Sequence, residues 1–175
     1  MHKPELFTLS NIDWQLFCTF TFKSEKLTDG TRLKMFFSLL RKQADNFGVH
    51  FKKIIWCLRA ELGEATARKH FHALIAGLPA HSVHERTCFA TKNLWESEEI
   101  GGGMARVYVY SRSLAGAAYI LKGLEAVERR VSGDYYELTK FGGSCDVTLS
   151  ESILRVVEGR RAIGKRRRQA LRKAE

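Results

Sequence analysis

Two histidines flank one phenylalanine in the stretch RKHFHALIAG, residues 68–77, at the start of an apolar run. Side chains alternate between the two faces of a β-strand, so a strand here points His70 and His72 to one side and Phe71 to the other. Two imidazole nitrogens then converge on one small volume. An H-x-H pattern also arises by chance, with both rings partly buried and hydrogen-bonded, so the pair needs further support.

A carboxylate from the preceding segment can complete a metal site. Glu61 ends the run IIWCLRAE, and a hairpin would place it beside the start of the histidine strand. Glu64, in the connection between the two runs, is the alternative third ligand. Two imidazoles and one carboxylate with open positions suit Mn²⁺, Mg²⁺ or another divalent ion that acts as a Lewis acid. This ligand set differs from that of a closed structural zinc site.

A second pair of residues could supply a nucleophile. Tyr119 and Lys122 lie three residues apart in AAYILKGL, which puts them on one face of a predicted helix. Tyrosine can act as a covalent nucleophile when a metal ion polarises its target, and the lysine could offset developing negative charge or orient a phosphate. A Tyr-x-x-Lys pattern is common by itself, so its combination with the histidine pair is what is informative.

Hydrophobic periodicity predicts the elements that must position these residues. The run WQLFCTFTF predicts a first strand with Thr19 and Thr21 on one face. Apolar residues at helical spacing predict a helix over 28–48 that stops at Gly48. Further strands are predicted over 49–61, 70–78 and 104–111, with a short helix within 81–95.

The remaining segments complete the predicted fold. A helix is predicted over 111–130 with Ser113 as its cap, followed by a turn that contains Tyr135 and Tyr136. A short strand and a helix are predicted over 146–159. This order predicts an α+β fold, a central antiparallel sheet with helices over one face, related to the ferredoxin-like pattern.

Length and composition predict one folded domain and a basic tail. A chain of 175 residues with 45% hydrophobic content is enough for one core, which we assign to residues 1–158, with 159–175 as the tail. No window approaches the apolar length of a membrane span and the N-terminus lacks the regions of a secretory signal, so we expect a cytoplasmic protein without a membrane partner. Four cysteines without CxxC spacing are expected to be reduced thiols.

The positive charge is concentrated at the end of the chain. The net charge is +10, and the tail carries eight Lys or Arg residues and one Glu, which supply seven of these charges. The tail is interpreted as a phosphate-binding arm centred on Arg166, Arg167 and Arg168, with a solvated basic segment as the alternative. GRRAIGKR, residues 159–166, nearly spells a nucleotide phosphate loop, but Arg166 replaces the hydroxyl residue that holds Mg²⁺, which argues against a fused ATPase.

The order of the segments FCTFTF, HFH and YILK resembles the three motifs of the HUH endonucleases. The resemblance is to the single-tyrosine replication initiators, or Rep proteins, of plasmids and small phages or viruses. It covers residues from about 16 to 124 and includes the hydrophobic Phe71 between the two histidines. Each motif is short, so the specificity of the match comes from their order and spacing.

The resemblance implies an enzyme that cuts single-stranded DNA at a specific site. In this family a tyrosine becomes joined to the 5′ phosphate and a 3′ hydroxyl is released, with the histidine pair on a central strand and the tyrosine helix packed against the metal. The matching residues are His70 and His72 for the metal pair, Glu61 for the acidic residue that often precedes it, Tyr119 for the nucleophile, Lys122 for the lysine of the third motif, and Thr19 and Thr21 for the first motif near bound DNA.

The resemblance also implies partners and leaves alternatives open. The expected substrate is single-stranded or hairpin origin DNA, with a host helicase as a further partner and a prokaryotic host. The same chemistry would serve a single-tyrosine transposase or a mobilisation relaxase, which the DNA substrate would distinguish. A non-catalytic single-strand-binding module or repressor is the alternative from another class, and metal-dependent covalent capture of DNA would separate it from the enzymes.

Overall fold

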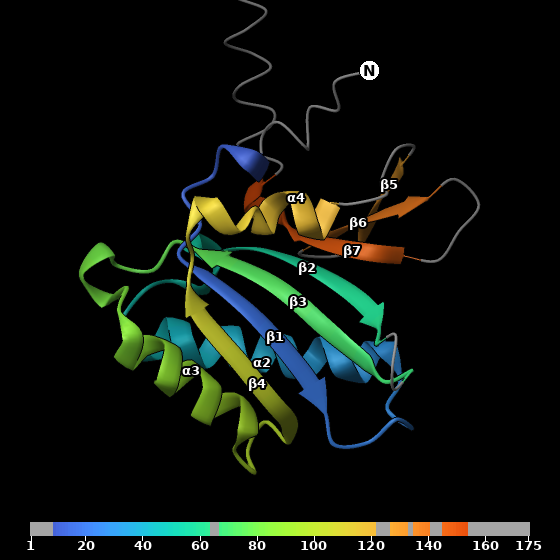
Figure 1. Ribbon diagram of the computed structural model, residues 1–175, viewed down its shortest axis with the longest axis horizontal. Helices are drawn as coiled ribbons and strands as arrows, with labels where there is room; N and C mark the ends of the chain where they lie inside the picture. Colours follow the sequence, from blue (N-terminus) through green and yellow to red (C-terminus); the bar gives the residue numbers. More distant parts are fainter. Residues whose placement is uncertain (1–8, 64–66, 122–126, 133–134, 141–144, 154–175) are drawn as a thin grey trace, which may run out of the picture.

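An antiparallel sheet forms the centre of the computed structural model, which describes residues 9–63, 67–121, 127–132, 135–140 and 145–153. Within these residues the sheet has seven strands in the order β4-β1-β3-β2-β7-β6-β5 (Figure 1). The strands are β1 (Leu16–Phe22), β2 (Ile55–Leu62), β3 (Lys69–Ala76), β4 (Gly102–Val109), β5 (Val127–Ser132), β6 (Tyr135–Lys140) and β7 (Cys145–Ser150). The predicted α+β fold is therefore confirmed.

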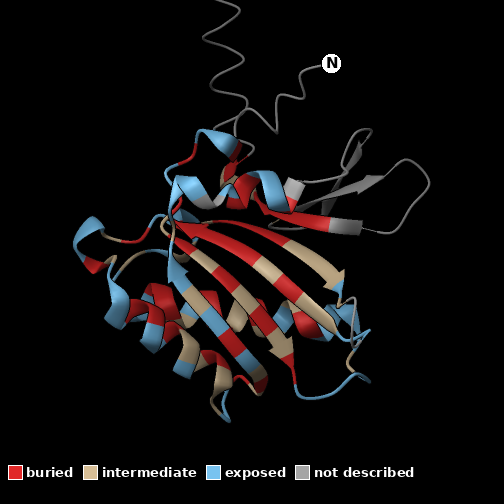
Figure 2. Ribbon diagram, in the orientation of Figure 1, coloured by how far each residue is buried: buried red, intermediate tan, exposed pale blue. Residues whose placement is uncertain are grey.

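Strict alternation along β1 gives the sheet two different faces. Its even-numbered residues are buried and the residues between them are half-buried (Figure 2). Phe20 lies on the buried face, with its ring 4.5 Å from that of Trp95 and 6.1 Å from that of Phe36. The alternation predicted from the sequence thus places Thr19 and Thr21 on the opposite face, away from this aromatic core.

Two helices, α2 (Asp29–Asn46) and α3 (Glu85–Glu96), cover the aromatic face. Thr28 caps α2, because its Oγ1 accepts a hydrogen bond from the backbone N of Thr31 at 3.1 Å. The helix ends before Gly48, whose positive φ of 60° is one that glycine adopts at little cost. The predicted helix and its stop at Gly48 are confirmed, as is a short helix within the segment 81–95.

A third helix, α4 (Gly116–Leu121), packs on the other face of the sheet, so the prediction that helices cover one face only is wrong. Ala117 and Ile120 are buried against a second apolar cluster that includes Leu74 of β3 and Leu149 of β7. Figure 1 shows α4 well separated from α2 and α3 and close to β7. Burial of apolar surface favours packing of α4 on the apolar half of this face. Among the described residues, no helix covers the polar half next to it.

The prediction of one long helix over 111–130 is also wrong. Residues Arg112–Leu114 form a 3₁₀ turn, and Ala115 has a left-handed φ of 47° before α4 begins. Ser113 does not cap the helix; its hydroxyl bonds the hydroxyl of Ser111 at 2.7 Å. Residues 127–132 form β5 because each pairs with a residue of β6, and these pairings outweigh local helical periodicity.

Smaller differences concern the ends of other elements. The predicted strand over 49–61 begins at Ile55, because residues Phe51–Lys53 form a 3₁₀ turn. Tyr135 and Tyr136 lie in β6 and not in a turn. The ring of Tyr135 packs 5.5 Å from that of Phe37 on the aromatic face, which explains why an aromatic residue occupies this strand position. Another 3₁₀ turn spans Ala80–Ser82. Among the described residues, no helix is both long and apolar enough to cross a membrane.

Candidate metal centre

On the face that carries α4, the register of three neighbouring strands, β1, β3 and β2, sets which polar side chains lie next to one another. Residues directly opposite one another in antiparallel strands share a face and lie within side-chain contact. One row across the three strands consists of Thr19, His72 and Arg59. The adjacent row consists of Thr21, His70 and Glu61. The hairpin thus places Glu61 directly opposite His70, as the sequence predicted for a third ligand.

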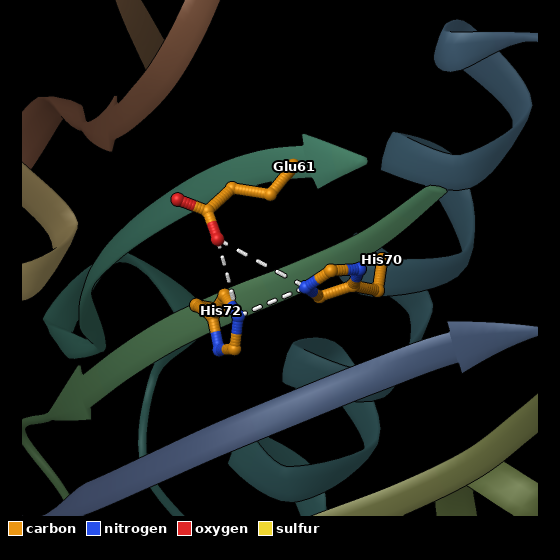
Figure 3. Close-up of side chains that lie close together, drawn as sticks. All are labelled: Glu61, His70 and His72. Carbon is orange, nitrogen blue, oxygen red and sulfur yellow. Dashed lines mark hydrogen bonds and ion pairs between the residues drawn. The ribbon is translucent and has the colours of Figure 1, made fainter. Parts of the chain in front are cut away.

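The side chains of Glu61, His70 and His72 point toward one another from β2 and β3 (Figure 3). The Nε2 atoms of the two histidines are 3.0 Å apart, and Glu61 Oε2 lies 3.5 Å from His72 Nε2 and 4.0 Å from His70 Nε2. Donor atoms that bind one ion at about 2.1 Å and at right angles are about 3.0 Å apart. Two imidazole nitrogens and a carboxylate oxygen therefore form a group that could hold a divalent metal ion.

The protonation state of His72 favours metal binding. The pKa of this imidazole is lowered from 6.5 to about 4, chiefly by burial and to a lesser extent by the neighbouring His70 and Arg59, against the opposing effect of Glu61. The ring is therefore neutral near pH 7. Its Nδ1 lies 3.0 Å from Thr19 Oγ1, a hydrogen bond that orients the ring with Nε2 toward His70 and Glu61.

The two oxygens of Glu61 have different partners. Oε1 lies 2.7 Å from the Nε atom of Arg59, while Oε2 faces the histidines. Oε2 also accepts a hydrogen bond of 2.8 Å from the hydroxyl of Tyr119. One carboxylate therefore connects the histidine pair to the predicted nucleophile. Glu64, the alternative third ligand, lies outside the described residues.

Tyr119 reaches this centre from α4, which packs on the same face of the sheet as the two histidines. Its ring lies 5.0 Å from that of His72 at an interplanar angle of 81°, and 41% of the residue is exposed. A partly exposed tyrosine next to a candidate metal site can be reached by a large substrate. Lys122 and the tail arginines Arg166, Arg167 and Arg168 lie outside the described residues.

Of the other residues predicted for the site, Thr19 contacts His72, whereas Thr21 has a structural role. The Thr21 hydroxyl donates a hydrogen bond of 2.8 Å to the carbonyl of Met104, and so links β1 to β4. Sequence reasoning missed Arg59, which contacts both Glu61 and the end of α4. The signal was present, because Arg59 lies two residues before Glu61 and a strand puts such residues on one face.

His81, His84 and Cys88 lie close together in sequence but do not form a ligand group. His84 caps α3 through Nδ1, which accepts from the backbone N of Thr87 at 3.3 Å, while Cys88 is buried. Within the described part of the chain, Glu61, His70 and His72 are the one group of at least three such side chains close enough to share an ion.

Comparisons of the chain with protein-family models, with curated proteins and with solved structures found no match. What supports a function is therefore the chemistry and geometry of the chain's own residues.

Proposed function

We propose that this protein is a metal-dependent endonuclease and strand transferase that cuts and rejoins single-stranded DNA through a covalent bond to Tyr119, and so initiates rolling-circle replication. The observation that carries the proposal is the 2.8 Å contact between the Tyr119 hydroxyl and Glu61 Oε2, the same oxygen that faces both histidines. A nucleophile and a candidate metal site thus adjoin on an accessible face of the sheet.

The proposed reaction exchanges one phosphodiester bond for another. A divalent ion held by Glu61, His70 and His72, Mn²⁺ or Mg²⁺, would supply Lewis-acid polarisation of the scissile phosphate. The phenol of Tyr119 loses its proton and its oxygen bonds phosphorus, while the bond from phosphorus to the 3′ oxygen breaks and that oxygen takes up a proton. The products are a 5′-phosphotyrosine ester and a free 3′ hydroxyl, and the reverse reaction rejoins the strand. Lys122 is proposed to offset the developing negative charge.

An exposed surface beside the centre supports a single-stranded nucleic acid as the substrate. On β4, Arg106 lies directly opposite Thr19, and Tyr108 lies opposite Phe17. Met104, Arg106 and Tyr108 follow the period of two along β4 and are all exposed on the face that carries the histidines. Aromatic rings stack on unpaired bases and guanidinium groups bind phosphates, which is the chemistry that single strands require.

The proposal extends to partners and location. The substrate is single-stranded or hairpin origin DNA, the arginines of the tail contribute phosphate contacts, and a host helicase separates the strands in the cytoplasm of a prokaryotic host. The related activities of a transposase or a relaxase use the same covalent chemistry. The sequence of the captured strand, from a replication origin or from the end of a mobile element, distinguishes among them.

The test is covalent capture of DNA. Wild-type protein is incubated with a pool of labelled single-stranded oligonucleotides and Mn²⁺, with and without a chelator, and separated under denaturing conditions. We expect a metal-dependent protein–DNA adduct. Tyr119→Phe removes the nucleophilic oxygen, so the adduct should fall by at least about 1,000-fold while DNA binding is retained.

Tyr135→Phe is the matched control. It removes another phenol, which packs near Phe37 on the aromatic face, and should leave the adduct unchanged. An adduct that persists in Tyr119→Phe would show that the nucleophile is assigned wrongly. No adduct in wild type, despite demonstrated binding to the same oligonucleotides, would favour a non-catalytic DNA-binding module.

A further inference from the structure

Arg59 contacts two parts of the centre that belong to different elements. Its Nε atom lies 2.7 Å from Glu61 Oε1, and one of its terminal nitrogens donates to the backbone carbonyls of Ile120 at 2.9 Å and Tyr119 at 3.3 Å. Only 14% of the side chain is exposed. A single guanidinium group therefore joins the carboxylate of β2 to the end of α4.

The α4 helix depends on such tertiary contacts. It has six residues, and helices this short are marginal in water without packing partners. The last carbonyls of a helix also lack partners within the helix, and a basic side chain can satisfy them. The carbonyls that Arg59 binds belong to Tyr119 itself and to its neighbour Ile120, which anchors α4 in the apolar cluster.

The same guanidinium orients the carboxylate. With Oε1 held by Arg59, Glu61 presents Oε2 to the histidines and to the Tyr119 hydroxyl. The planar guanidinium carries several N–H groups in a rigid fork, so it can bind the carboxylate and the helix end together. A lysine keeps the positive charge but offers a single nitrogen in place of the fork.

We propose that Arg59 is a positioning residue that holds the nucleophile Tyr119 at a set distance from the carboxylate ligand Glu61. This role rests on the proposed function, because the value of a set distance lies in aligning the phenol with a phosphate beside the metal site. The proposal gives Arg59 no contact with the DNA. Its loss should therefore slow the covalent step and loosen the metal site without weakening DNA binding.

The test is Arg59→Lys, with Arg112→Lys as the matched control. Arg112 also pairs with a carboxylate, that of Asp13 at 2.6 Å, and lies just before α4, but it is exposed and does not contact the centre. In Arg59→Lys we expect adduct formation to slow by about 10–100-fold and the Kd for Mn²⁺ to rise by about tenfold, as for other partners that orient metal ligands. The Kd for the oligonucleotide and the Tm should stay near the wild-type values.

Two further measurements separate positioning from a general loss of structure. Amide hydrogen exchange over residues 116–121 should be faster in Arg59→Lys than in wild type, with β1 and β3 unchanged and no such increase in Arg112→Lys. Arg59→Ala should lose adduct formation in the same way, and added ethylguanidinium should restore part of it, because the small cation can occupy the space that the side chain leaves.

The outcomes decide the proposal in either direction. Wild-type adduct rates and wild-type exchange of α4 in folded Arg59→Lys would overturn it, and so would a slower rate that is fully explained by weaker DNA binding. If wild type forms no adduct, the proposed function fails. In that case Mn²⁺ affinity and the exchange of α4 still show whether Arg59 holds the helix and the carboxylate together.

Discussion

The two faces of the sheet are built from the same strands and differ in nearly every other respect. On one face, Phe20, Phe36 and Trp95 form a closed aromatic core beneath α2 and α3. On the other face, α4 covers an apolar area near β7, and the rows that contain the two histidines are only half-buried. Side chains that alternate along one backbone therefore serve two separate purposes.

The aromatic face of the sheet holds the centre on the other face in place. Each strand that supplies a polar side chain to the centre is fixed from behind by its apolar neighbours in sequence. Phe71 is buried on the aromatic face between His70 and His72, and Leu58 and Ala60 of β2 pack on the same side. Rigid strands hold side chains more accurately than loops do, which suits a site that must align a phenol with a phosphate.

The two faces should differ most in how much their side chains contribute to stability. Phe20→Ala removes a fully buried ring and should lower the free energy of unfolding by about 3–5 kcal/mol. Thr19→Val, at the preceding residue and on the other face, should change it by less than about 1 kcal/mol. Urea unfolding followed by circular dichroism measures both values. Equal losses at the two positions would contradict the separation of the two faces.

The next effect concerns metal binding. Here the larger change is expected from a substitution on the histidine face, and the smaller one from a substitution on the aromatic face. His70→Ala removes a direct ligand, so the Kd for Mn²⁺ should rise by roughly 100-fold or more, and adduct formation should fall with it. Phe71→Leu, between the two histidines but on the aromatic face, should keep the affinity within about twofold at a stability cost of about 1 kcal/mol. Calorimetric titration of both variants with Mn²⁺ distinguishes them. Unchanged affinity in His70→Ala would exclude this group as the metal site.

The smallest effect is on the pH dependence of stability in metal-free protein. Because the pKa of His72 is lowered from 6.5 to about 4 in the folded chain, the unfolded chain binds a proton at this residue first as the pH falls. The contribution of the neutral His72 imidazole to stability is thus fully present above about pH 6.5, and it is lost as the pH falls toward 4. Urea unfolding at pH 7 and pH 5 should show a smaller decrease for His72→Gln than for wild type.

His81→Gln is the control for this measurement, since His81 is exposed in the 3₁₀ turn Ala80–Ser82 and lies outside the group formed by Glu61, His70 and His72. It should keep the wild-type decrease between the two pH values. A decrease of the same size in His72→Gln and in wild type would mean that the imidazole of His72 is not held neutral by its surroundings.

Local patterns were enough to predict a large part of this molecule. The period of two placed Thr19 and Thr21 on one face of β1, and His70 and His72 together on β3, because backbone geometry alone sets that alternation. Helical spacing and the glycine at position 48 likewise predicted α2 and its end. A hairpin connection was sufficient to place Glu61 beside His70.

The tertiary structure decided what local patterns leave open. Whether residues 127–132 continue a helix or form a strand depends on pairing with β6, a partner that periodicity within one segment does not reveal. The face on which α4 packs depends on where an apolar area remains uncovered once β7 has joined the sheet. The contacts of Arg59 with α4 span about sixty residues of sequence and exist only in the folded chain.

The residue types of the centre and the faces on which strand residues lie could therefore be predicted without the structure, since covalent geometry over a few residues sets those faces. Only the folded chain decided that the Tyr119 hydroxyl meets Glu61 and that Arg59 joins the two elements. The physical reason is that packing and strand pairing act between segments distant in sequence, and their free energy depends on every surface that the rest of the fold leaves exposed.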